Sequence, residues 1–105
     1  MEVAAILRSV SAAGGFATVV SKGEAERGAL LLLVSSRGRH VTCLERVLAA
    51  SGDYGWQRAG PAESASSTEL RDFLAKRARF DPDMWAIELD IVDPERFIAE
   101  TTSSG

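Results

Sequence analysis

The sequence predicts an α+β domain in which an antiparallel sheet of four or five strands packs against two helices, in the order α-β-β-β-(β)-α-β. Two observations support this prediction. Segments 2–13 and 66–79 repeat apolar residues at helical spacing. Four other segments combine β-branched, aromatic or continuous apolar residues with bounding glycine, proline or polar turns, as strands do.

The length and composition are those of one globular domain. The chain has 105 residues, of which 46% are hydrophobic and 26% are charged, so it lies outside the regime of disordered chains. We expect one domain over residues 1–100 and a polar tail over 101–105. The longest apolar run, 29–34, is far shorter than the roughly 20 residues of a membrane-spanning helix. With a single cysteine and no export signal, the sequence predicts a cytoplasmic protein.

The first half of the chain is predicted to be one helix followed by three strands. In segment 2–13 the apolar residues recur at i, i+3, i+4 and i+7, and Gly14-Gly15 ends the helix. Segment 16–21 is rich in β-branched residues. Segment 29–34 is apolar without alternation, which is typical of a strand covered on both faces. Segment 40–47 alternates roughly and follows a short turn, so we expect it to pair antiparallel with 29–34.

The second half begins with an irregular region and continues with a helix. Segment 49–67 collects glycine, proline and serine and is predicted to be mainly loop. Tyr54 and Trp56 within it are compatible with a short edge strand. The motif Ser66-x-x-Glu69 has the form of a capping box, and the apolar stripe behind it predicts a helix to about Arg79.

The clearest strand covers 84–91, where apolar and polar residues alternate after the helix is ended by Pro82. We expect this strand to insert beside an earlier one. Asp93 and Glu95 extend its acidity toward Pro94 and favour an exposed edge there. The strand is predicted to turn Trp85, Ile87, Leu89 and Ile91 toward the core, and Met84, Ala86, Glu88 and Asp90 to the other face.

Two sequence blocks resemble the opening and closing blocks of a known bacterial family. They are GGFATVVSKG at 14–23, with Gly28 beyond it, and ARFDPDMWAIEL at 78–89, and the element Leu44-Glu45-Arg46 lies between them. The family consists of short, single-domain proteins that carry a domain-of-unknown-function label. The resemblance implies a bacterial cytosolic setting and the boundaries of the fold. Because the family has no assigned activity, no residue of this chain inherits a catalytic role.

Catalytic chemistry finds little support in the sequence. His40 and Cys43 are the only residues of their types, but positions three apart in a strand project to opposite faces, so a nucleophile and base pair is not expected. We predict that Cys43 is a buried apolar residue. A closed zinc site needs about four such ligands. The sequence therefore predicts no catalytic residue and no cofactor, although the enzyme question stays open.

An acidic cluster provides one alternative function. Asp81, Asp83, Glu88 and Asp90 lie close together in the sequence, and carboxylates are ligands for hard cations. A small-ligand or metal-dependent enzyme using residues 81–90 is therefore the first alternative. The simpler interpretation, which we favour, is a solvated outer face with a helix stop and a turn.

The leading hypothesis is a noncatalytic protein-interaction module whose partner is unknown, with self-association as a homodimer among the options. Trp56 is the best single contact residue, because exposed aromatic residues are enriched where partners dock. The basic residues Arg71, Lys76, Arg77 and Arg79 are further candidates, and RNA or ribonucleoprotein binding through them is the second alternative. The formal net charge of −3 argues against nucleic acid as a partner.

Overall fold

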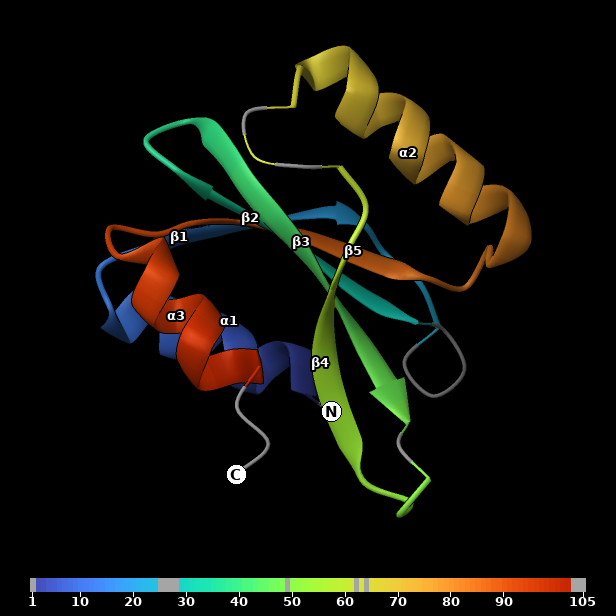
Figure 1. The fold of residues 1–105 in the computed structure, drawn as a ribbon, viewed down its shortest axis with the longest axis horizontal. Coiled ribbons are helices and arrows are strands. Elements are labelled where there is room, and N and C mark those ends of the chain that lie inside the picture. Colours follow the sequence, from blue (N-terminus) through green and yellow to red (C-terminus); the bar gives the residue numbers. More distant parts are fainter. Residues whose placement is uncertain (1, 25–28, 49, 62, 64, 103–105) are drawn as a thin grey trace.

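A mixed sheet of five strands forms the middle layer of the computed structural model, with α2 on one face and α1 and α3 on the other (Figure 1). The structure describes residues 2–24, 29–48, 50–61, 63 and 65–102. In chain order the elements are α1 (Glu2–Ala12), β1 (Phe16–Ser21), β2 (Leu30–Ser36), β3 (Arg39–Leu48), β4 (Tyr54–Ala59), α2 (Ser67–Phe80), β5 (Trp85–Asp90) and α3 (Pro94–Thr102).

The strands lie in the order β1-β5-β2-β3-β4. The expected insertion of the last strand is confirmed, since β5 lies between β1 and β2. The prediction of a wholly antiparallel sheet is wrong, because β5 runs parallel to β2. The chain leaves β4 at the far edge and returns through α2, and such a helical crossover brings it back beside β2 in the same direction.

The uninterrupted apolar run of β2 is explained by helices on both faces of the sheet. Leu30, Leu32 and Val34 belong to the core that α1 and α3 cover, and Leu31 and Leu33 belong to the core that α2 covers. All five side chains are at most 3% exposed. The central strand is therefore buried on both faces, as the sequence predicts.

The faces of β5 agree only in part with the prediction. Ile87 and Leu89 lie in the core under α1 and α3, as expected. The opposite face is not a solvated one along its whole length, because Met84 and Ala86 are buried under α2. Of the four residues predicted on that face, only Glu88 is exposed, and it lines a groove beside α2.

The structure contains a third helix, α3, which the prediction of two helices omits. Asp93 caps this helix, because its Oδ1 accepts a hydrogen bond of 3.2 Å from the backbone N–H of Arg96. Pro94 occupies the first helical position, where its missing N–H has no consequence. Asp93 and Glu95 thus begin a helix and do not extend an exposed strand edge. The helix includes Thr101 and Thr102, and residues 103–105 of the predicted tail lie outside the described residues.

Local signals in the second half of the chain are confirmed. The fourth strand that Tyr54 and Trp56 suggest is β4, which pairs with β3. The predicted capping box is present, since Ser66 Oγ accepts from the Glu69 N–H at 3.1 Å and Glu69 Oε1 accepts from the Ser66 N–H at 3.3 Å. No helix in the described part of the chain is long and apolar enough to cross a membrane.

The two blocks that carry the family resemblance meet in space. β1 from the first block pairs with β5 from the second. Beyond β1, Gly23 packs so closely against the backbone of Asp83 that a Cβ atom at this glycine would lie 1.9 Å from the Asp83 carbonyl oxygen. The next residue, Glu24, donates its N–H to that same oxygen at 2.9 Å. The glycine is therefore required for packing.

We predict that Gly23→Ala lowers the free energy of unfolding by at least about 2 kcal/mol, because backbone atoms must move to admit the methyl group. Gly55→Ala is the matched control, since nothing lies within 4 Å of its Cβ position, and it should change stability by at most about 0.5 kcal/mol. Urea denaturation of both variants measures the difference. Equal stability of the two variants would contradict the packing role.

Candidate functional site

The outer edge of β1 is the most open part of the sheet. Within the described residues β1 pairs with β5 alone, so its other edge presents unpaired backbone N–H and C=O groups. Phe16 is 78% exposed, Val19 43% and Val20 50%. The six residues include no charge and no proline, the features with which edge strands usually discourage pairing. This edge can accept another strand.

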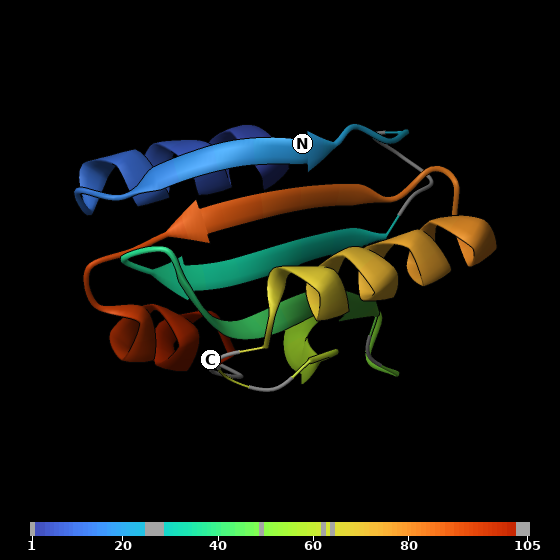
Figure 2. The same cartoon turned by 90° about the horizontal axis from the view of Figure 1, so that it is seen from above.

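A shallow groove continues this edge onto the face of the sheet that carries α2. Figure 2 shows α2 lying over β2 and β3. The first part of β5 is also buried under α2, at Ala86, whereas Glu88 of β5 and the residues of β1 at Phe16, Thr18 and Val20 are exposed. The groove has a volume of about 250 Å³. Its walls are mainly apolar and carry one charge of each sign; they comprise Val20, Leu33, Ser67, Leu70, Arg71, Leu74 and Glu88.

The opposite edge of the sheet, β4, is better protected. It contains Arg58, and the guanidinium of Arg46 lies 4.8 Å from the ring centroid of Tyr54. Trp56, the predicted contact residue on this strand, is half-buried and packs against the core under α1 and α3. Much of its ring is therefore unavailable to a partner.

The basic residues of α2 do not form a single patch. Arg71 lines the groove beside β1, whereas Lys76 and Arg79 line a separate hollow. Arg77 points toward the sheet, where it forms an ion pair with Glu45. The side chains of this pair are 26% and 18% exposed. The four candidates are thus divided among three environments.

The acidic residues are likewise separated, and two of them bind backbone groups. Asp81 Oδ2 accepts from the Ala29 N–H at 2.9 Å and its Oδ1 accepts from the Asp83 N–H at 3.2 Å. At the other end of β5, the Asp90 carboxylate accepts from the N–H groups of Arg37 and Gly38 at 2.9 and 3.0 Å. In the residues that the structure describes, no group of three or more His, Cys, Asp or Glu side chains could hold a metal ion.

Asp90 closes the hairpin between β2 and β3. Arg37 and Gly38 form the turn and have positive φ angles of 54° and 78°, as a two-residue hairpin turn requires. Their N–H groups point at the carboxylate of Asp90. Asp81 is the C-cap residue of α2, so the predicted helix stop is confirmed. The solvated outer face does not include Asp90, which is half-buried and bound to the backbone.

His40 and Cys43 are both buried, at 5% and 0% exposure. His40 Nε2 lies 3.2 Å from the carbonyl oxygen of Pro61. Cys43 packs in the core under α2, as predicted, and burial raises the pKa of its thiol to about 11, although the Arg77 charge lowers the pKa in part. A thiol with so high a pKa is a poor nucleophile at neutral pH.

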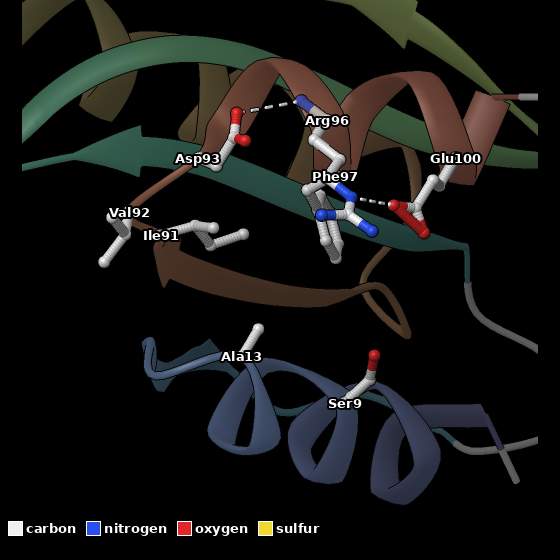
Figure 3. A pocket seen from close by; sticks show the side chains of 8 residues that line it. All are labelled: Ser9, Ala13, Ile91, Val92, Asp93, Arg96, Phe97 and Glu100. Carbon is white, nitrogen blue, oxygen red and sulfur yellow. Dashed lines mark hydrogen bonds and ion pairs between the residues drawn. The ribbon is translucent and has the colours of Figure 1, made fainter.

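A second hollow, of about 560 Å³, lies between α1 and α3 (Figure 3). Ser9 points into it from α1, Ala13 from the turn that follows this helix, and Phe97 from α3. The Arg96 guanidinium at its rim is 2.8 Å from Glu100, and both side chains are largely exposed. Because the two charges neutralise each other in water, they offer a small ligand little orienting force.

We predict that the Cys43 thiol reacts slowly in the folded protein. Raising its pKa from 9.0 to about 11 lowers the thiolate fraction at neutral pH about 100-fold, and burial blocks access as well. Modification with Ellman's reagent should therefore be at least about 100-fold slower in native protein than in guanidinium. A fast native reaction would show that the thiol is accessible.

Asp81→Asn should lower the free energy of unfolding by about 1–2 kcal/mol, because its amide can no longer accept both backbone hydrogen bonds. Asp83→Asn is the control with the same chemical change. The backbone groups of Asp83 form hydrogen bonds, but its side chain forms none within the described residues. It should alter stability by at most about 0.5 kcal/mol. Thermal unfolding of the two variants tests this difference, and equal effects would contradict it.

Comparison with known proteins places the chain among proteins of unknown function. Residues 1–99 match the model of a family described as "Protein of unknown function (DUF1491)". No curated protein matches the chain.

Three solved structures have similar folds. The crystal structure of a DUF1491 family protein from Caulobacter crescentus is 32% identical, with a TM-score of 0.72, and the match covers 90% of this chain and 88% of that one. The NMR structure of a DUF1491 family protein from Caulobacter crescentus is also 32% identical, with a TM-score of 0.70 and coverage of 88% and 83%. Protein Atu0922 from A. tumefaciens is 27% identical, with a TM-score of 0.71 and coverage of 84% and 80%.

Proposed function

The chain belongs to the DUF1491 family of proteins of unknown function, and we propose that it is a noncatalytic protein-interaction module that binds an extended segment of its partner at the edge of β1. Membership of the family confirms the resemblance drawn from the sequence. The proposal depends chiefly on one observation, the uncharged outer edge of β1 with its exposed side chains Phe16, Val19 and Val20.

Strand addition suits this edge for two physical reasons. A segment that pairs with β1 forms hydrogen bonds with the backbone N–H and C=O groups that are unpaired at the outer edge of this strand. Such bonds supply affinity that depends little on the sequence of the segment. The exposed apolar side chains supply the remainder, because each is removed from water when a neighbouring strand covers it. Phe16, at 78% exposure, has the largest apolar area to contribute.

The groove beside β1 adds a means of selection. Side chains of the added segment that point toward the α2 face would lie against Leu70 and Leu74, with Arg71 and Glu88 as the charges nearby. We therefore expect a partner segment that is mainly apolar and uncharged. Any charged side chains near its middle should sum to zero net charge, because the groove carries one charge of each sign. Of the five partner-binding residues predicted from sequence, Arg71 is the one that this proposal retains.

The noncatalytic part of the proposal follows from how the reactive side chains are used. Asp81 and Asp90 bind backbone N–H groups, and Cys43 is a buried thiol of raised pKa. An acid-cluster enzyme would need its carboxylates together, and RNA binding would need the basic residues of α2 in one patch. The described residues supply neither arrangement.

Thr18→Lys tests the proposed function. Thr18 lies in the middle of β1 opposite Glu88, so the new ammonium group is tolerated by the fold but places a charge where an uncharged strand would pair. When the tagged protein is purified from its host, a partner protein should copurify in stoichiometric amount; this partner can be an untagged copy of the same chain. Thr18→Lys should lower the amount of copurified partner at least about tenfold. Quantitative mass spectrometry measures the retained protein.

Gln57→Lys is the matched control, because it adds the same charge to an exposed position of the other edge strand, β4. It should retain the partner like the unmodified protein. If nothing retained depends on Thr18, or if both lysine variants lose the partner equally, the edge of β1 is not the binding surface.

A further inference from the structure

We infer that the partner at the edge of β1 is a second copy of the same chain, which pairs with it through an antiparallel β1–β1 contact centred on Thr18. This inference rests on the proposed function and identifies the occupant of the same surface. Two copies related by a two-fold axis would join their five-stranded sheets into one continuous sheet of ten strands, five from each copy.

The sequence of β1 is self-complementary in this register. In an antiparallel pair, residues directly opposite each other lie on the same face of the sheet. A two-fold axis at Thr18 puts this residue opposite its own copy, Phe16 opposite Val20 of the second copy, and Ala17 opposite Val19. Threonine pairs and pairs of an aromatic with a β-branched residue are among those that stabilise antiparallel strands.

The side chains that would meet are those left exposed in the single chain. Phe16 and Thr18 pair with Asp90 and Glu88 of β5, so they lie on the α2 face, and Val20 lines the groove on that face. The irregularity of β1 falls at Val20, between Val19 and Ser21, which leaves Ala17, Thr18 and Val19 around the axis in regular strand geometry. Phe16, Thr18 and Val20 would therefore meet their counterparts on the α2 face, and Val19, which pairs with Ile87 of β5, would meet Ala17 on the opposite face.

The charges of the groove favour a second copy over a charged partner. Each copy contributes Arg71 and Glu88, one charge of each sign, on the wall next to β1. A two-fold axis brings this wall toward an identical one, so opposite charges can face each other across the contact and none is left in excess. The strand contains no charge that its own copy would repel.

The surface required for a stable dimer is available around β1. Specific dimers bury roughly 800 Å² on each copy, which is more than the backbone edge of a short strand alone offers. The three exposed apolar side chains and the groove wall formed by Leu70 and Leu74 adjoin that edge. The inferred contact therefore includes the rim of α2 as well as the strand.

Light scattering after size exclusion, repeated over a range of protein concentration, tests the inference. The unmodified protein should have twice the mass of one chain, and Thr18→Lys should be monomeric, because two ammonium groups would face each other at the axis and weaken the dimer at least about 100-fold. Gln57→Lys should remain dimeric. Mixing Thr18→Lys with Thr18→Glu should restore a dimer that contains one chain of each kind.

A disulfide tests the register without relying on a disruptive charge. Thr18→Cys places two thiols opposite each other at a Cα separation that a disulfide can span, so mild oxidation should give a covalent dimer. Gln57→Cys should not cross-link. The native Cys43 does not interfere, because it is buried.

A monomer at every concentration, a dimer that withstands Thr18→Lys, or an absent Thr18→Cys cross-link would each overturn the inference. A monomer whose binding to a different protein is still abolished by Thr18→Lys would overturn it while leaving the proposed function intact. Loss of all Thr18-dependent binding would remove both.

Discussion

The fold depends on β5 being held between β1 and β2, two strands from much earlier in the chain. Residues of β2 pair with residues of β5 that lie more than fifty positions later. At both ends of β5, hydrogen bonds join β5 or the residue next to it to β2 or the residue next to that strand. At its start, the Trp85 N–H donates to the Ala29 carbonyl oxygen at 2.9 Å. The Ala29 N–H in turn donates to the carboxylate of Asp81. At its end, Ile91 donates to Ser35 at 2.9 Å and Asp90 binds the hairpin turn. The two aspartates thus fix the register of the central parallel pair.

This insertion determines where each surface lies. Because β5 fills the position beside β2, β1 lies at the edge of the sheet. α2 covers the middle of the sheet and does not lie over β1. α1 and α3 cover the other face, where Val10 and Ile98 complete the core. The open edge at β1 is therefore a direct result of the topology, and so is the groove that α2 leaves beside it.

Local features and the antiparallel pairing of β2 with β3 could be predicted from the sequence, whereas the parallel pairing of β5 could not. The capping box at Ser66 and the buried run in β2 depend on neighbours in the chain, and both are confirmed. The parallel pairing of β2 with β5 depends on contacts between residues that are far apart in the chain, and a single sequence gives no direct information about such contacts. The helix after Asp93-Pro94 had a usable signal, an N-cap followed by proline, but the acidity around it suggested an exposed strand edge.

The candidate site escaped prediction for the same reason. The sequence identifies 16–21 as a strand, but whether its side chains are buried depends on which strands flank it. If β1 were central, Phe16 and Val20 would be core residues; at the edge they are exposed. Conversely, Asp81 and Asp90 suggested ligand chemistry from sequence and turn out to bind the backbone.

The edge of β1 is also where a partner would change the protein most. β1 is the least buried strand whose exposure is described along its whole length, and only its Ala17 is even half-buried. Few apolar contacts and a solvent-exposed edge are the properties of segments that open locally at low free energy. A strand added to this edge would cover its backbone and its apolar side chains together, so binding and local ordering would be coupled. The same features that make β1 weak in the single chain make it the surface with the most to gain from association.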